Sequence, residues 1–104
     1  MSRLGRYVAQ VGGTVVGTCN AHGSPRSFIG TWTSGSSTSQ ANGKGIVRVG
    51  DTGTTNCGHH IQATEGSSVV TCDGILVHRE GDACIVIEGG TGTTISGSDY
   101  VMSF

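Results

Sequence analysis

The apolar residues of this chain fall into short β-branched runs separated by small and polar residues. The runs are Val15–Val16, Ile46–Val47, Val69–Val70, Ile75–Val77 and Ile85–Ile87. Branched side chains favour strands, because their restricted χ1 angles suit a pleated surface. Glycine, present in 19 copies, and the abundant Ser and Thr residues disfavour long helices and suit tight turns. The pattern therefore predicts an all-β fold built from short strands.

The same local pattern recurs along the chain at two fixed offsets. The shorter offset, from Gly35 to Gly66, relates Gly35-Ser36 to Gly66-Ser67 and to Gly97-Ser98, Gly43 to Gly74, and Arg48-x-Gly50-Asp51 to Arg79-x-Gly81-Asp82. The longer offset, from Gly5 to Gly43, also relates Val11-Gly12 to Val49-Gly50, Cys19 to Cys57, and His22 to His60. Recurrence at a fixed spacing is the signature of a repeat architecture. We therefore read residues 1–104 as one domain of three repeats, approximately 5–42, 43–73 and 74–104.

Each repeat is expected to contain a short strand, a Gly-Asp turn, a variable loop, a Gly-Ser turn and a second short strand. Asn42-Gly43 and Asp73-Gly74 can supply the positive φ angles that tight reversals need. Hairpins this short are not stable alone in water, so the three units should share one small core around a pseudo-threefold axis. The expected shape is a small cone, a tapering three-sided prism.

Composition changes this picture by indicating that something besides the core holds the fold together. Hydrophobic residues make up 35% and aromatic residues 5% of the 104 residues, which predicts a thin core. The net charge is -1 and no Lys/Arg cluster is present, so nucleic acid and anionic membranes are not expected partners. The segment Met1–Tyr7 lacks the apolar stretch of a signal peptide. Free thiols or metal ligands are thus favoured for the four cysteines, with a secreted, disulfide-stabilised β-module as an alternative.

Two matched Cys-x2-His pairs carry the candidate chemistry. Cys19 with His22, and Cys57 with His60, occupy equivalent positions in two repeats, so pseudo-symmetry should bring them to the same end of the axis. Zinc prefers four such ligands in a tetrahedron, and structural zinc contributes about 10 to 16 kcal/mol to the folding of small domains. Cys84 is a further candidate, since it precedes Gly97 by the same interval that separates His22 from Gly35. We expect a tip pinned by structural zinc, in preference to iron.

The stretch Gly35–Asp51 resembles the unit of PAAR-repeat proteins, with a Gly-Ser turn, a strand, Asn-Gly-Lys, and a second strand that ends in Val-Gly-Asp. Gly66–Asp82 is a looser copy, and Gly97–Phe104 is similar to a truncated one. The resemblance implies a β-rich cone whose broad base docks, one copy per trimer, on the blunt end of a trimeric β-helical spike, VgrG-like or a phage tail hub. It also implies a tip zinc held by histidine and cysteine. Because such proteins more often use three histidines and one cysteine, His59 joins the candidates.

The resemblance implies a structural role, in which the protein caps and sharpens the spike of a contractile injection system for envelope piercing. It implies transient contact with a target-cell envelope, and a location at a phage tail tip or, for type VI secretion, in the bacterial cytoplasm before delivery. The residues expected to meet the spike are Val69, Val70, Tyr100, Val101 and Phe104.

No catalytic activity and no small-molecule substrate are expected. Cys57 beside His59 or His60 would suit a Cys-His hydrolase, but the chain offers little scaffold for a pocket, and only Glu65 lies near the candidate zinc ligands in sequence. A small zinc-dependent hydrolase is kept as the alternative function. Cys72 is expected to be a strand-face or core thiol, and His78 to belong to a strand because it occupies the position of Val47 in its repeat.

Overall fold

The computed structural model describes residues 6–41, 43–96 and 102–103, the last two through their backbone. All regular structure in these ranges is β, which confirms the all-β prediction. The strands are β1 (Arg6–Tyr7), β2 (Thr14–Cys19), β3 (Arg26–Trp32), β4 (Gln40–Ala41), β5 (Lys44–Gly45), β6 (Thr52–Thr55), β7 (His60–Ala63), β8 (Thr71–Cys72), β9 (Ile75–Leu76), β10 (Ala83–Val86), β11 (Gly90–Thr94) and β12 (Met102–Ser103). A helix with the length and apolarity needed to cross a membrane is absent from the described ranges.

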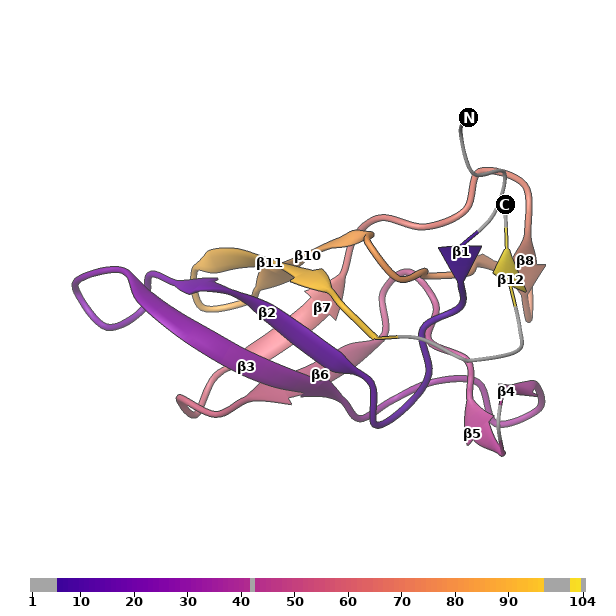
Figure 1. The fold of residues 1–104 in the computed structure, drawn as a ribbon, viewed down its shortest axis with the longest axis horizontal. Helices are drawn as coiled ribbons and strands as arrows, with labels where there is room; N and C mark the ends of the chain where they lie inside the picture. The colour runs from indigo at the N-terminus through magenta and orange to yellow at the C-terminus, as the bar shows by residue number, and fades with distance from the viewer. Residues whose placement is uncertain (1–5, 42, 97–101, 104) are drawn as a thin grey trace.

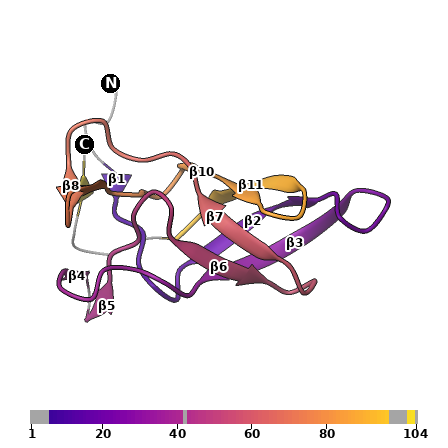
Figure 2. The same cartoon turned by 180° about the vertical axis from the view of Figure 1, so that it is seen from behind.

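The main body is a closed antiparallel barrel. Within the described residues, six strands follow one another around it in the order β2, β3, β6, β7, β10 and β11. Each predicted repeat contributes one hairpin, and neighbouring hairpins pair β3 with β6, β7 with β10, and β11 with β2. Figures 1 and 2 show that the turns of these hairpins point to the same end of the molecule. Closure of the barrel leaves no free strand edge among its six described strands.

The opposite end carries short two-stranded ribbons. The described strands form β4–β5, β8–β9 and β1–β12, so segments near the two ends of the chain meet to complete the last ribbon (Figure 1). The turn of β8–β9 has Asp73 at φ 57° and Gly74 at φ 78°, which confirms the predicted reversal there. Gly43 likewise has φ 75°, whereas Asn42 lies outside the described residues.

Between barrel and ribbons, the three repeats are joined by a ring of backbone hydrogen bonds. The Ala9 amide donates to the His78 carbonyl (2.9 Å), His78 to Val47 (3.0 Å) and Val47 back to Ala9 (2.9 Å). All three residues are fully buried, and the longer and shorter offsets of the sequence repeats relate them to one another. The bridges Val8↔Arg79, Gln10↔Ile46 and Arg48↔Val77 run around the same cycle. This closed ring confirms the pseudo-threefold arrangement of the repeats.

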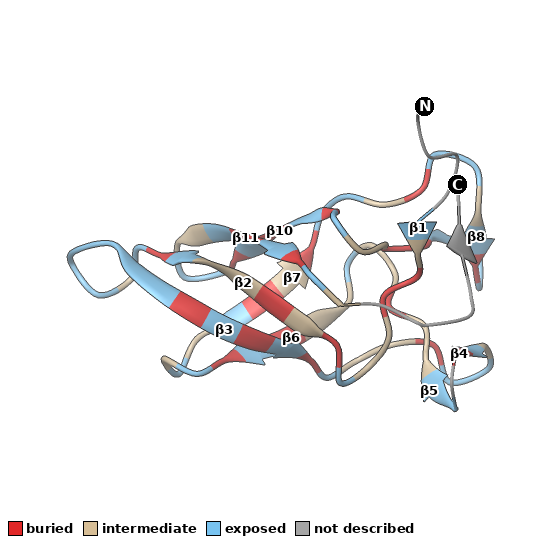
Figure 3. Ribbon diagram, in the orientation of Figure 1, coloured by how far each residue is buried: buried red, intermediate tan, exposed pale blue. Residues whose placement is uncertain are grey.

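The barrel core is filled asymmetrically. Trp32, Ala63 and Thr94 occupy equivalent positions at the last residues of β3, β7 and β11, and all three are buried. One large side chain therefore lies beside two smaller ones in the close-packed interior. Buried and exposed residues alternate along β3, as Figure 3 shows. Gly53 of β6 has no room for a side chain, since a Cβ there would clash with the Thr31 carbonyl oxygen.

A buried polar chain runs beside the indole. The Trp32 Nε1–H donates to Thr94 Oγ1 (2.9 Å), and the Thr94 hydroxyl lies 2.7 Å from His78 Nε2. His78 Nδ1 lies 2.6 Å from the Glu65 carbonyl oxygen, which fits a neutral imidazole that donates from Nδ1 and accepts at Nε2. Burial lowers the pKa of His78. The histidine thus lies at the junction between barrel and ribbons, at the position equivalent to Val47, and away from the hairpin turns. The expected strand assignment is wrong, because β9 ends at Leu76 and β10 begins only at Ala83, so His78 lies between the isolated bridge residues Val77 and Arg79.

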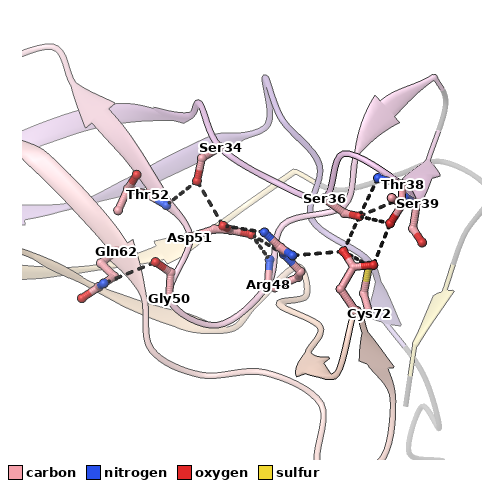
Figure 4. Close-up of polar contacts among 11 residues, drawn as sticks. Ser34, Ser36, Thr38, Ser39, Arg48, Gly50, Asp51, Thr52, Gln62 and Cys72 are labelled. Carbon is pink, nitrogen blue, oxygen red and sulfur yellow. Dashed lines mark hydrogen bonds and ion pairs between the residues drawn. The ribbon is translucent and has the colours of Figure 1, made fainter.

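The Arg-x-Gly-Asp motifs form equivalent turns that also link repeats. Asp51 accepts hydrogen bonds from the Arg48 amide (2.8 Å) and Nε (2.9 Å), and Asp82 accepts the same pair from Arg79. Figure 4 shows Arg48 between Asp51 and the serine-rich segment around Ser36. The Arg48 Nη1 also reaches Asp73 (3.0 Å), which accepts the Ser36 hydroxyl at 2.7 Å. Asp73 therefore ties the β8–β9 ribbon to the first repeat through side chains.

Candidate metal centre

Four donor residues converge at the turn end of the barrel. Cys19 is the last residue of β2, and His22 follows in the loop between β2 and β3. Cys57 and His59 lie in the turn between β6 and β7. The two segments come from different repeats, yet they lie at the same end because the barrel aligns all its hairpins (Figures 1 and 2).

The β6–β7 turn is held in shape by Thr55. Its hydroxyl oxygen accepts the His59 amide at 3.0 Å, and its own amide donates to the His59 carbonyl oxygen at 2.9 Å. Gly58 at φ 86° takes the left-handed conformation that reverses the chain. This compact turn presents the side chains of Cys57 and His59 together.

The donor atoms of Cys19, His22, Cys57 and His59 all lie within 4.8 Å of one another. Cys19 Sγ is 3.4 Å, and Cys57 Sγ 3.6 Å, from His59 Nδ1. In a tetrahedral zinc site with ordinary bond lengths, neighbouring ligand atoms are about 3.3 to 3.8 Å apart. Modest side-chain adjustment would therefore bring the group to ligand geometry. The group could hold a metal ion.

Burial and electrostatics also suit metal ligation. Cys19 is fully buried, Cys57 and His59 are half-buried, and His22 is exposed, so the group faces solvent on one side. The Thr55 hydroxyl lies 3.0 Å from Cys57 Sγ. Its hydrogen bond, followed by those of His22 and His59, lowers the pKa of Cys57 to about 6. The thiolate, which is the form that binds metals, is thereby favoured near neutral pH.

His60, one of the leading sequence candidates, lies outside this group. It is the first residue of β7, where the alternation of the strand turns its side chain outward and the next residue, Ile61, into the core. Its Nδ1 lies 2.9 Å from Glu88 Oε2. That contact lowers the pKa of Glu88 to about 2. The Cys-x2-His match therefore pointed one residue too far, since His59 of the turn is the histidine beside the thiols.

Cys84 also lies elsewhere, inside the barrel. It sits in β10 opposite Gly92 and is buried among apolar residues, which raises the pKa of its thiol to about 11. The strand register makes it the counterpart of Val15 and Gly53, not of His22. The interval to the following Gly-Ser pair was misleading because the β2–β3 loop is longer than the other hairpin turns. Cys72 is buried in β8, as expected for a strand-face thiol, and all four thiols are free.

Sequence reasoning missed two residues around this group. Thr55, two positions before Cys57, shapes the turn and contacts the thiol. Glu88 follows Cys57 by the shorter repeat offset, so the repeat itself would have pointed to it. Neither residue type suggests a soft-metal site by itself.

Comparison with known protein families and with curated proteins found no match to this sequence.

Proposed function

We propose that this protein is a structural spike tip of the PAAR type, pinned at its apex by one zinc ion. The observation that carries the proposal is the position of the donor group. Cys19, His22, Cys57 and His59 gather at the turn end of a pseudo-threefold barrel, while the short ribbons lie at the opposite end. A threefold body with one stapled end suits a cap on a threefold spike.

Zinc is the metal that this donor set fits best. Two thiolates and two imidazoles form a common closed structural site, in which all four positions are taken by protein and none is left for a substrate. The mixture of soft and borderline donors disfavours magnesium and calcium, which take oxygen ligands. The ion would join the β2–β3 loop to the β6–β7 turn and so close the apex of a barrel with a small core.

The ribbon end is proposed as the face that docks on the blunt end of the trimer. Val69, beside β8, is 70% exposed, and Ile75 and Leu76 of β9 are exposed as well. Val70 is partly buried against the apolar cluster that contains Cys72 and Val77, so it offers less exposed surface for docking than Val69. Tyr100, Val101 and Phe104 lie outside the described residues. Apolar contact over a matched threefold outline would drive the association.

Co-purification with a trimeric β-helical spike fragment tests the docking. The expected result is one copy of this chain per trimer, and a Val69→Asp variant should weaken the complex. Ile29→Asp is the matched control, because Ile29 is also an exposed apolar residue (56%) but lies on the barrel wall. Three copies per trimer, or no complex, would refute the cap.

Metal content tests the pin independently. Protein purified without added zinc should contain one zinc ion per chain, and Cys57→Ser should lower that content sharply. Cys72→Ser is the matched control, since Cys72 is a thiol of the ribbon end. A parent protein without bound metal would reject the proposed site.

A further inference from the structure

The β10–β11 turn contacts both segments that carry the donor group, although none of the four described donor atoms comes from it. The carbonyl oxygen of Gly89 accepts the amide of Asn20 (2.9 Å), the residue after Cys19. The amide of Ile87 donates to the carbonyl oxygen of His60 (2.8 Å), the residue after His59. The turn thus bridges the two segments from the third hairpin.

Glu88 is the centre of this bridge. Its Oε1 accepts the His60 amide at 3.0 Å, and its Oε2 lies 2.9 Å from His60 Nδ1. One carboxylate therefore holds both the backbone and the ring of the residue beside His59. With the Ile87 amide, three hydrogen bonds fix the residue that follows the β6–β7 turn to the third hairpin.

The repeat offsets also make the position of Glu88 equivalent to those of the two cysteine donors. The longer offset relates Cys19 to Cys57 and the shorter one relates Cys57 to Glu88, just as they relate Gly12 to Gly50 and Gly50 to Gly81. Those glycines all have φ between 87° and 96°, so the offsets mark structurally equivalent positions. Glu88 is thus the third repeat's counterpart of the two thiol donors. Its side chain binds His60 instead of joining the donor group.

We propose that Glu88 is the positioning residue of the metal centre. It holds the β6–β7 turn so that Cys57 and His59 stay converged on Cys19 and His22. This inference rests on the proposed metal site. A short turn that contains a glycine gains order from an outside anchor. Groups that hydrogen-bond the metal ligands directly commonly change metal affinity by about 10- to 100-fold, and Glu88 acts one residue further out, through His60. The third repeat would thereby contribute to the site through position, while the first two contribute the donors.

Zinc affinity, measured by competition with a chromophoric chelator, tests this role. Glu88→Ala should raise the zinc dissociation constant by up to about tenfold, the lower end of the range for groups that bond the ligands directly. Glu88→Gln, which keeps one acceptor for the His60 amide, should lie between Glu88→Ala and the parent. Glu65→Ala is the matched control, because Glu65 Oε1 also accepts a backbone amide, that of Ala83 at 2.8 Å, but lies beyond the other end of β7. Its dissociation constant should equal that of the parent.

Glu88→Asp separates positioning from simple attraction between charges. It keeps the carboxylate but is one methylene shorter, so it cannot reach the His60 amide and ring together. Positioning predicts weaker zinc binding and altered visible absorption bands of the cobalt-substituted protein. Parent-like affinity in Glu88→Asp or in Glu88→Ala would overturn the inference and leave the metal site standing. A parent that binds no zinc would overturn both.

Discussion

The three repeats are linked by different chemistry at the two ends of the barrel. At the junction with the ribbons, Ala9, Val47 and His78 close a ring of backbone hydrogen bonds to which each repeat contributes equally. At the turn end, the donor group comes from two repeats and the third supplies Glu88 in the equivalent position. The difference has a simple cause. Almost every residue has one amide and one carbonyl, so a threefold ring can be satisfied by most sequences, whereas a tetrahedral ion needs four donors and three equal repeats cannot share four.

The side chains of the axial core differ from repeat to repeat, as the residues of the donor group do, whereas the backbone ring is alike in all three. Trp32 fills space that Ala63 and Thr94 leave free, and His78 stands where the other repeats have Val47 and Ala9. Backbone symmetry therefore coexists with side-chain asymmetry in the buried interior. Perturbing each region separately shows how far the two are independent.

Removal of the proposed zinc ion should have the largest effect. Structural zinc contributes about 10 to 16 kcal/mol to the folding of small domains, so a chelator should lower the thermal midpoint of unfolding strongly. The loss should be local first. Amides of the β2–β3 loop and the β6–β7 turn should exchange faster, while those of Ala9, Val47 and His78 stay protected. An unchanged midpoint in zinc-loaded protein treated with chelator would contradict the pin.

Trp32→Ala should break the axial core next. The substitution leaves a cavity beside Ala63 and removes the donor to Thr94, and truncation of a buried Trp costs about 3 to 5 kcal/mol. Urea unfolding measures the loss. Ile29→Ala, an exposed apolar position on the same strand, is the control and should cost far less. Equal losses for the two variants would show that the axis is not the core of the barrel.

Acid should weaken the junction through His78. Burial lowers the pKa of His78 in the folded protein, so the unfolded chain binds the proton more readily. The stability that depends on neutral His78 is therefore fully present above the unfolded pKa of about 6.5 and is lost as the pH falls below it. The slope for one proton is at most about 1.4 kcal/mol per pH unit. Urea midpoints of metal-free protein between pH 7 and 5, roughly the range where an ordinary His titrates, measure this effect.

His78→Val provides the comparison, since valine is the residue at the equivalent position 47. The variant should lose most of the pH dependence in that interval, whatever its stability at neutral pH. A pH dependence equal to that of the parent would assign the effect to other groups. The pKa values of the Asp51, Asp73 and Glu88 carboxyl groups are lowered, so these groups take up protons only at pH values more acidic than this interval.

Asp73→Asn should have the smallest effect. Asparagine tolerates the φ of 57° found at this turn, so the variant removes the charge facing Arg48 and leaves the backbone in place. The side chain of Asp73 is 35% exposed, so solvent screens its pair with Arg48 and the loss of stability should be small. The loss should shrink further at high salt. A loss of stability that is large and independent of salt would show that Asp73 stabilises the fold mainly by accepting hydrogen bonds from Ser36 and Thr38, and not through its charge.

Much of the fold was predictable because of the repeat. Glycine and aspartate recur at the spacings that the structure uses, and the turn at Asp73-Gly74 has the positive φ angles that its residues favour. The barrel itself was not predicted, since closure depends on pairing between hairpins that are far apart in sequence. The pairing of β1 with β12 is of the same kind.

The donor group shows where prediction from sequence stops. Cysteine and histidine at matched positions indicated the chemistry and the end of the molecule where it lies. The choice between His59 and His60 depends on where β7 begins, and a shift of one residue turns a strand side chain to the opposite face. Docking on a trimeric spike, envelope piercing and the absence of catalysis remain predictions.

By itself, the sequence determined the strand-rich character, the repeat spacing and the residue types able to hold a soft metal. These depend only on the conformational preference of each residue type and on the number and spacing of residues along the chain. The tertiary structure decided which donors meet. The barrel brings the donor atoms of two segments from different repeats within 4.8 Å, turns His60 towards Glu88, and encloses Cys84 among apolar side chains. Such choices follow from strand register and burial, which exist only once distant segments are packed together.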